Sequence, residues 1–333
     1  MNIVLLFGSG ISTPADYPCV GQITEGILSG MDSAEACQPS SAVGVGSGTG
    51  EVGSAGAVDV LAFLRWLRTV VEARYCDWNQ RVANYEDIYF VASQIHDDLL
   101  DEFDNPALRP MIQRAIAEFV LLQGASCSDA TEHLQGLAGR AVDCIRKQVV
   151  SRLGTLPKRE KLRHLGFIGQ SIQAAGIENI TILTLNHDVL AETYLKERGV
   201  GFADGFSREV DDMGVRRWQP SSFRGSNGSV RLLKLHGGVD WYRLRPFGAQ
   251  EWTEDYVGII PGGSSSWYGD GQGGRHSTRK DAQGRTHSSL EEMLLIGTFN
   301  KLSRYTDPVY LEIYHLAFQA FERADGLVGA HLN

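Results

Sequence analysis

The spacing of hydrophobic positions changes along the chain, and each kind of spacing predicts a different element. Ile3 to Phe7 is a short, nearly unbroken apolar run, which is typical of a strand buried on both faces of a parallel sheet. Similar runs occupy 180–185, 230–235 and 256–260. Each run ends in small or polar residues, and open parallel sheets bind their ligands at the carboxyl ends of their strands. We therefore expect these strand ends to share one crevice.

Between 58 and 176 the apolar positions recur with a period of 3.6 residues and form four stripes. The stripes begin at Leu61, Ile88, Ile112 and Leu134. We interpret them as packing surfaces of a helical module rather than as a cofactor-binding face. Asn84 precedes one stripe and is followed by two acidic residues, which predicts a capped helix start.

The remaining pattern completes the expected organisation. Further helices are predicted over 20–28, 189–196, 290–305 and 308–324. The Gly- and Ser-rich stretches 38–57 and 264–289 have too little large apolar surface to offset ordering entropy, so flexible loops are expected. The predicted fold class is α/β, with a Rossmann-like, mostly parallel sheet flanked by helices. Residues 1–30 and 177–333 would form the Rossmann-like domain, and 58–176 the large helical insertion.

Composition narrows the possible partners and location. The formal net charge of −9 argues against wide, sequence-independent contact with nucleic-acid phosphates. There is no apolar run of about 18 residues and no basic lead-in to the first strand, so we expect a cytoplasmic protein with neither a membrane span nor a signal peptide. The five cysteines include no C-x-x-C pair, so we expect reduced thiols and no zinc.

Polar residues at the strand ends are the candidates for chemistry. Gly8, Ser9 and Gly10 follow the first strand, where glycines let the backbone approach a pyrophosphate and a following helix offers free N–H groups. Taken alone, this G-x-G turn fits a plain strand-to-helix connection equally well. Asn186 and His236 follow the strands at 180–185 and 230–235. A turn-forming asparagine and a hydrogen-bonded core histidine remain the structural alternatives for these two residues.

Three motifs stand in a fixed order, namely FGSGIS at 7–12, TLNHD at 184–188 and KLHGGVDW at 234–241. Together they resemble the sirtuin-like branch of the silent-information-regulator superfamily. The NAD site of that family is built from a G-A-G-x-S loop, a T-x-N-x-D strand end and an L-H-G-S strand end. The resemblance implies catalytic roles for Asn186 and His236. It also implies a set of NAD-binding residues: Gly8, Ser9, Gly10, Ile11, Ser12, Asp188 and Gly237.

Departures from that pattern indicate which branch the chain resembles. Protein deacylases of the superfamily carry a zinc ribbon of two cysteine pairs after the histidine motif, whereas this chain has no cysteine after Cys144. The segment TPADYP at 13–18 also differs from the P-D-F-R segment of those deacylases. The chain is instead similar to bacterial anti-phage defence members, in which the domain consumes NAD+ without a metal. Their terminal G-x-x-x-x-D-x-H-x-N motif is shortened here to LVGAHLN.

The candidate residues suit cleavage of the bond between nicotinamide and ribose. That reaction passes through an oxocarbenium-like state, and the cationic nicotinamide leaves without an acid. An asparagine amide such as Asn186 can orient a water or a ribose hydroxyl, and a neutral histidine such as His236 can accept a proton. In an extended segment the side chain of His187 points to the opposite side from those of Asn186 and Asp188. We therefore predict a structural role for His187.

The leading hypothesis is an NAD+ hydrolase that releases nicotinamide and ADP-ribose. Uncontrolled hydrolysis would kill the cell, so we expect activation by a HerA-type ATPase, an Argonaute-like partner or assembly into a homo-oligomer. One alternative is an ADP-ribosyl transferase, and another is a non-catalytic module that senses NAD or ADP-ribose. A dehydrogenase is less well supported, because Glu35 and Glu51 lie in or near the Gly-rich stretch rather than in a ribose-binding setting.

Overall fold

The computed structural model describes residues 1–30, 55–76, 81–100, 105–120, 129–224, 230–246, 255–261, 281, 284, 286–297 and 306–330. The chain divides into two compact units. One contains Met1–Cys19, Ser151–Leu295 and Leu302–Asn333, and the other contains Val20–Val150 and Ile296–Lys301. The expected helical insertion at 58–176 overlaps the second unit over most of its length.

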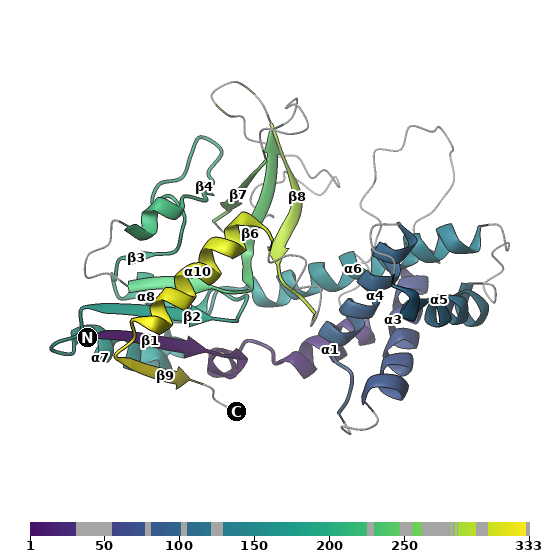
Figure 1. Cartoon of the computed structure of the whole chain (residues 1–333), viewed down its shortest axis with the longest axis horizontal. Coiled ribbons are helices and arrows are strands. Elements are labelled where there is room, and N and C mark those ends of the chain that lie inside the picture. Colours follow the sequence, from purple (N-terminus) through teal and green to yellow (C-terminus); the bar gives the residue numbers. More distant parts are fainter. Residues whose placement is uncertain are drawn as a thin grey trace. The chain divides into compact units, whose positions relative to one another are not determined.

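The first unit is built on a five-stranded parallel sheet with the order β3-β5-β2-β1-β9 (Figure 1). Its strands are β1 (Asn2–Phe7), β2 (Asn179–Thr184), β3 (Phe202–Ala203), β5 (Val230–Lys234) and β9 (Gly326–Ala330). All four pairings are parallel. The prediction of an α/β fold with a mostly parallel, Rossmann-like sheet is confirmed.

The register aligns the carboxyl ends of the three inner strands. Phe7 of β1 lies opposite Thr184 of β2, and Thr184 lies opposite Lys234 of β5. Val4 and Leu5 are almost completely buried, as the apolar run predicts for a strand between two parallel neighbours. The segments that follow β1, β2 and β5 therefore leave the sheet at one edge.

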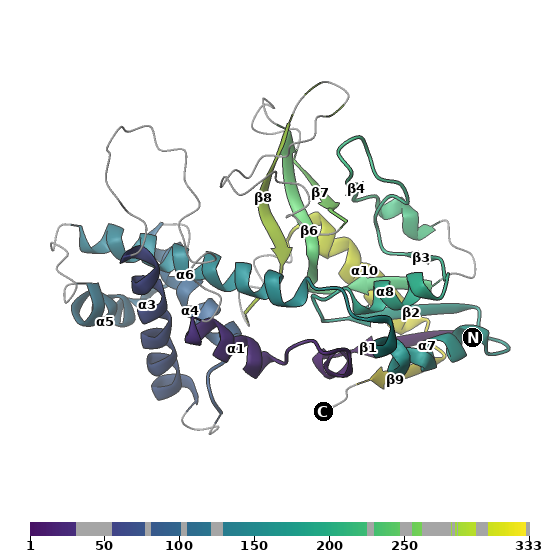
Figure 2. The ribbon, with the colours of Figure 1, turned by 180° about the vertical axis from the view of Figure 1, so that it is seen from behind.

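Helices cover both faces of this sheet. Figures 1 and 2 show α10 (Pro308–Glu322) on one face and α7 (Gly166–Gln173) and α8 (Leu190–Glu197) on the other. Val309 and Ile313 of α10 pack into the core with Leu233 of β5. The helices predicted over 189–196 and 308–324 are confirmed to within two residues. Short 3-10 turns precede and connect these elements: η1 (Ser9–Ile11), η2 (Thr13–Ala15), η8 (Arg159–Leu165) and η9 (Pro220–Arg224).

A second sheet of four antiparallel strands has the order β4-β7-β6-β8. Its strands are β4 (Arg216–Arg217), β6 (Gly237–Pro246), β7 (Tyr256–Ile259) and β8 (His287–Leu294). The run at 256–260 does form a strand, but the expectation that its end joins the common crevice is wrong because β7 belongs to this sheet. The helix predicted over 290–305 is also wrong where the structure describes it, because β8 pairs with β6. A short apolar run fits either element, and this pairing decided between them.

Two expected loops lie mainly outside the described residues. Within 38–57, the described part begins the helix α3 (Ala55–Val71). Within 264–289, the last three residues belong to β8, where His287 is fully buried and its ring contacts Tyr256 and Asp281. The loop expectation is therefore wrong at the ends of both stretches, because these residues join a helix and a strand.

The second unit is helical. Its helices are α1 (Val20–Ser29), α3, α4 (Tyr85–Leu99), α5 (Arg109–Ala115) and the first part of α6 (Ala130–Leu153), with the turns η3 (Glu72–Cys76), η5 (Pro106–Leu108) and η6 (Ile116–Val120). Leu64, Ile95 and Leu134 of three predicted stripes are completely buried, so these stripes are packing surfaces. The predicted cap is confirmed, because Asn84 Oδ1 accepts from the Glu86 and Asp87 amides at 2.9 and 3.2 Å. The Asp87 side chain in turn accepts a hydrogen bond from the Asn84 amide.

Two further findings bear on the sequence-based expectations. Cys144 is buried and forms a disulfide, so the expectation of reduced thiols is wrong at this position. None of the helices in the described ranges has both the length and the hydropathy that a membrane span requires.

Candidate functional site

The three sequence motifs meet at the carboxyl edge of the parallel sheet. Gly8 follows β1, Asn186 follows β2 and His236 follows β5, and β2 is the neighbour of both other strands. We call the loop 8–12 together with Asn186, Asp188 and His236 the Asn186 site.

A chain of hydrogen bonds joins the first two motifs. Asn186 Nδ2 donates to the Gly8 carbonyl at 3.0 Å and to Ser12 Oγ at 2.9 Å. Ser12 Oγ in turn donates to Asp188 Oδ2 at 2.7 Å. Asn186 and Ser12 are 174 positions apart in sequence, so only the sheet register brings them together. The amide orientation of Asn186 is fixed by two acceptors on the glycine loop.

Asp188 connects this chain to helix α8. Its Oδ1 accepts from the Leu190 amide at 3.0 Å, at the first residue of α8, while Oδ2 holds Ser12. Both residues are buried. The single hydroxyl proton of Ser12 is committed to Asp188, so this arrangement leaves Ser12 no donor for a phosphate. Both side chains therefore position the loop and the helix.

The glycine loop departs from the expected strand-to-helix geometry. Two 3-10 turns, η1 and η2, follow β1, and the next α-helix begins only at Val20. The Ile11 and Ser12 amides bond back to Gly8 and Ser9 at 3.2 and 3.1 Å. Within the described part of the chain, nothing accepts a hydrogen bond from the Ser9 or Gly10 amide. These two N–H groups are the donors that the loop can offer to an anion.

His236 is half-buried at the end of β5. Its carbonyl accepts from the Leu295 amide at 3.0 Å, and its ring centroid lies 6.1 Å from that of His187. Gly237 follows with a φ of +77°, and a Cβ there would lie 1.9 Å from the Met293 carbonyl oxygen. Glycine at 237 therefore has a steric reason that is independent of any ligand.

A buried charged layer lies under the site, and sequence reasoning did not identify it. Lys234 is 2% exposed, and its Nζ donates to Glu192 Oε1 at 2.8 Å and to the Asp188 carbonyl. The lysine in the apolar strand VRLLK was the available signal, because a buried ammonium requires acidic partners. Its partner Glu192 lies 42 positions away, on α8.

Burial sets the protonation behaviour of this layer. It raises the pKa of Glu192 and of Asp240, and the nearby Lys234 ammonium opposes that rise without cancelling it. Burial alone would lower the pKa of Lys234, but the carboxylates of Glu192, Asp240 and Asp188 outweigh it and raise that pKa. Burial also raises the pKa of Tyr17, and the negative charge of Asp188 raises it further. The neutral Tyr17 hydroxyl donates to the Thr155 carbonyl at 2.9 Å.

A small cavity lies between the site and α8. Its volume is about 10 Å³, and its polar lining comes from Ser12, Thr184, Asn186, Asp188 and Glu192. This volume is about what one water requires. Glu192 Oε2 is buried and has no hydrogen-bond partner within the described ranges, so a water here would satisfy it. A nicotinamide ring does not fit this volume, so a substrate must contact Asn186 from its partly exposed side.

No family model matches the sequence, and neither does any curated protein. Over the ranges that the structure describes, no three His, Cys, Asp or Glu side chains are grouped as metal ligands.

Proposed function

We propose that this chain is a sirtuin-like NAD+ hydrolase that cleaves NAD+ into nicotinamide and ADP-ribose. The observation that carries the proposal is the placement of Asn186. Its amide is fixed by Gly8 and Ser12 at the carboxyl edge of a parallel sheet, and His236 stands at the end of the neighbouring strand. Ligands of open α/β sheets bind at this edge.

Asn186 is the group that would orient the reacting oxygen. Both of its hydrogen bonds to the glycine loop come from Nδ2, so Oδ1 remains an acceptor with a fixed direction. A water or a ribose hydroxyl that donates to Oδ1 would be held in one orientation, which lowers the entropic part of the barrier. The half-buried position of Asn186 leaves room for such a contact.

His236 is the proposed proton acceptor. Neighbouring strands are about 4.8 Å apart, so the ends of β2 and β5 can contact one substrate. The water oxygen would bond to the anomeric carbon of the ribose as the bond to nicotinamide breaks. The bonding pair would neutralise the pyridinium ring, and the neutral imidazole would take the water proton.

The diphosphate of NAD+ would contact the glycine loop through the Ser9 and Gly10 amides. No described residue accepts a hydrogen bond from either of these N–H groups. Ser12 is assigned a positioning role instead, because its proton is held by Asp188. The buried carboxylate of Asp188 also adds negative charge near the reacting ribose, which favours an oxocarbenium-like state.

Regulation is part of the proposal. A cytoplasmic NAD+ hydrolase must be inactive at rest, and the space beside Asn186 is only about 10 Å³. Activation by a HerA-type ATPase, an Argonaute-like partner or self-assembly would fit an antiviral effector that depletes NAD+. Leu311 and Phe318 lie one heptad apart on α10 and are 53% and 69% exposed, which supports a homo-oligomer through an apolar contact.

The test is NAD+ consumption by the purified chain at high concentration, with nicotinamide and ADP-ribose quantified separately. We expect Asn186→Ala and His236→Ala to lower the rate by at least about 100-fold, the usual contribution of an acid–base group. Asn179→Ala is the matched control, since Asn179 lies at the opposite end of β2 and contacts Asn2. His315→Ala, on the exposed side of α10, controls for the loss of a histidine.

Two results would contradict the proposal. Tight NAD+ binding without turnover, in a chain shown to be oligomeric or bound to its partner, would indicate a sensing module. Transfer of labelled ADP-ribose to protein or nucleic acid, in place of free ADP-ribose, would indicate a transferase.

A further inference from the structure

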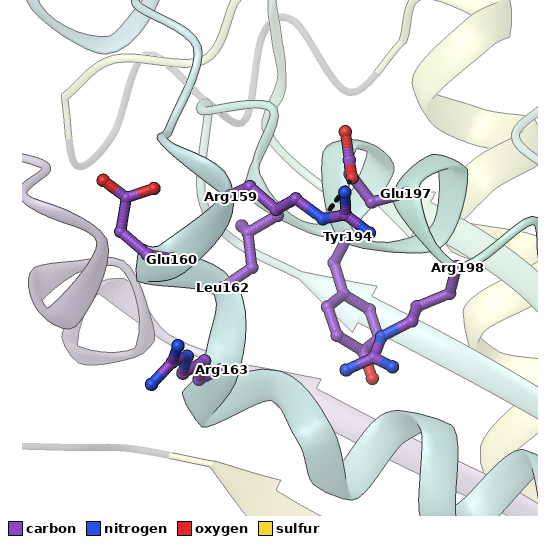
Figure 3. A pocket seen from close by; sticks show the side chains of 7 residues that line it. All are labelled: Arg159, Glu160, Leu162, Arg163, Tyr194, Glu197 and Arg198. Atoms are coloured by element: carbon purple, nitrogen blue, oxygen red, sulfur yellow. Dashed lines mark ion pairs between the residues drawn. The ribbon is translucent and has the colours of Figure 1, made fainter.

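A second cavity, much larger than the first, lies between the turn η8 and helix α8. Its volume is about 600 Å³, which is within the range of small-molecule sites. We call it the arginine cavity, and Figure 3 shows the residues that line it: Arg159, Glu160, Leu162, Arg163, Tyr194, Glu197 and Arg198. All of them belong to the unit that contains the parallel sheet.

The charged groups of the arginine cavity are unevenly paired. Arg159 Nε forms an ion pair with Glu197 at 3.1 Å, drawn as the dashed line in Figure 3. Neither Arg163 nor Arg198 forms an ion pair with any residue in the described ranges. Glu160 points away from Tyr194 and Glu197 in Figure 3. Arg163 also points away from Tyr194 in Figure 3, on the same side of η8 as Glu160, whereas the Arg198 guanidinium lies beside the Tyr194 ring. The cavity therefore has two arginines, one on each wall, that form no ion pair with a described residue.

The floor of the cavity is formed by the ring of Tyr194 and the side chain of Leu162. The Tyr194 ring is 2% exposed, and its hydroxyl lies 2.9 Å from where a Cβ on Gly169 would be. The Arg198 guanidinium lies 5.6 Å from the centre of that ring, where a cation is attracted to the aromatic face. Leu162 is also buried. The Arg198 guanidinium beside this floor, with Arg163 on the opposite wall, suits a ligand that carries both phosphates and a flat organic group.

The two walls of the arginine cavity are also walls of the small cavity at the Asn186 site. On α8, Leu190 and Glu192 line the small cavity, whereas Tyr194 lines the large one. On η8, Leu162 lines the large cavity and Leu165 the small one. His164 lies between Leu162 and Leu165 on η8, and its Nε2 forms a hydrogen bond with the carbonyl of Ile11 in the glycine loop at 2.8 Å.

We propose that the arginine cavity binds a phosphate-bearing small molecule of nucleotide size and acts on the Asn186 site through α8 and η8. Binding would draw Arg163 and Arg198 toward one ligand and stiffen both walls. The Asp188 carboxylate, which holds the start of α8, would then be held more firmly against Ser12. The proposal concerns binding and rigidity, and it holds whether or not NAD+ is the substrate of the Asn186 site.

The experiment is calorimetric titration of the full chain with ADP, with sodium pyrophosphate and with a single-stranded oligonucleotide, at low salt. We expect ADP to bind most tightly and to weaken with added salt. Arg163→Gln and Arg198→Gln should each weaken ADP binding at least about tenfold, the order expected when a charge-assisted hydrogen bond is lost. Arg208→Gln, an exposed arginine outside the cavity, is the matched control. The three side chains are exposed, so melting temperatures should stay unchanged.

Each arm has an outcome that would overturn the proposal. ADP binding that survives both cavity substitutions but is lost in Asn186→Ala would place the ligand at the Asn186 site. Equal binding of ADP and pyrophosphate would exclude a role for the organic group, and tighter binding of the oligonucleotide would exclude a small-molecule site. Absence of any binding at low salt would refute it outright.

The coupling has its own readout. Hydrogen exchange of peptides covering 186–192 should slow when ADP is bound, in the native chain and in His236→Ala alike. Bound ADP with unchanged exchange over 186–192 would refute the link through α8. Neither readout uses NAD+ hydrolysis, so failure of the proposed activity would leave this test intact.

Discussion

The Asn186 site and the arginine cavity share helix α8, yet their polar groups are satisfied in different ways. At the Asn186 site, Ser12 and Asp188 are buried and bonded to other protein groups. In the arginine cavity the guanidinium groups are exposed, and only Arg159 has a carboxylate partner among the described residues. A buried, bonded group is costly to remove, whereas an exposed charge contributes little to stability.

This difference separates stability from binding along one helix. The end of α8 near Asp188 is fixed by the fold, so its geometry is pre-organised before any ligand arrives. The other end presents charges that water screens until a ligand covers them. Substitutions at the first end should change the free energy of unfolding, and those at the second should change only affinity.

The largest effect is expected at the charged layer below the Asn186 site. Lys234→Met would leave the buried Glu192 and the partly buried Asp240 without their cation, which typically costs about 3 to 5 kcal/mol of unfolding free energy. Urea unfolding followed by circular dichroism would measure it. The double variant Lys234→Met with Glu192→Gln should recover part of the loss. A loss below about 1 kcal/mol in Lys234→Met would mean that this layer is not a fixed part of the fold.

A double-mutant cycle on Ser12 and Asp188 should give the next largest effect. Their hydrogen bond is 2.7 Å long, buried and charge-assisted, so Ser12→Ala and Asp188→Asn should couple by about 1 to 3 kcal/mol. The hydrogen bond between Asn179 and Asn2, which joins two neutral amides, is the control and should couple by less. Additive losses at Ser12 and Asp188 would show that the glycine loop is not held by this contact.

The smallest effect is a pH dependence at Asp240. Its folded pKa lies above the ordinary value of 3.8, so the folded state binds more protons than the unfolded chain just above that pH. Wild-type stability from this group is therefore lost as the pH rises from 3.8 through the folded pKa. The advantage of Asp240→Asn over wild type should grow across that window, by about 1.4 kcal/mol per unit of pKa elevation. A constant difference between pH 4 and pH 8 would contradict this assignment.

Local patterns were sufficient for most elements but not for all. The run at Ile3 to Phe7 predicted β1, and the acidic residues after Asn84 predicted the capping box of α4. The helix predicted from residue 290 was wrong because a short apolar run fits a helix or a strand, and pairing with β6 decided it.

The sequence by itself determined the residue types at the strand ends, and so the kind of chemistry that the Asn186 site can perform. Only the tertiary structure decided which of those side chains are committed to one another. Ser12 meets Asp188 across 176 positions, and Lys234 meets Glu192 across 42. Such contacts depend on sheet register and on burial, which makes an unpaired polar group costly, and neither property is local in sequence. The arginine cavity has the same origin. Its two walls, η8 and α8, are separated in the chain by α7 and β2, so only the fold brings them together.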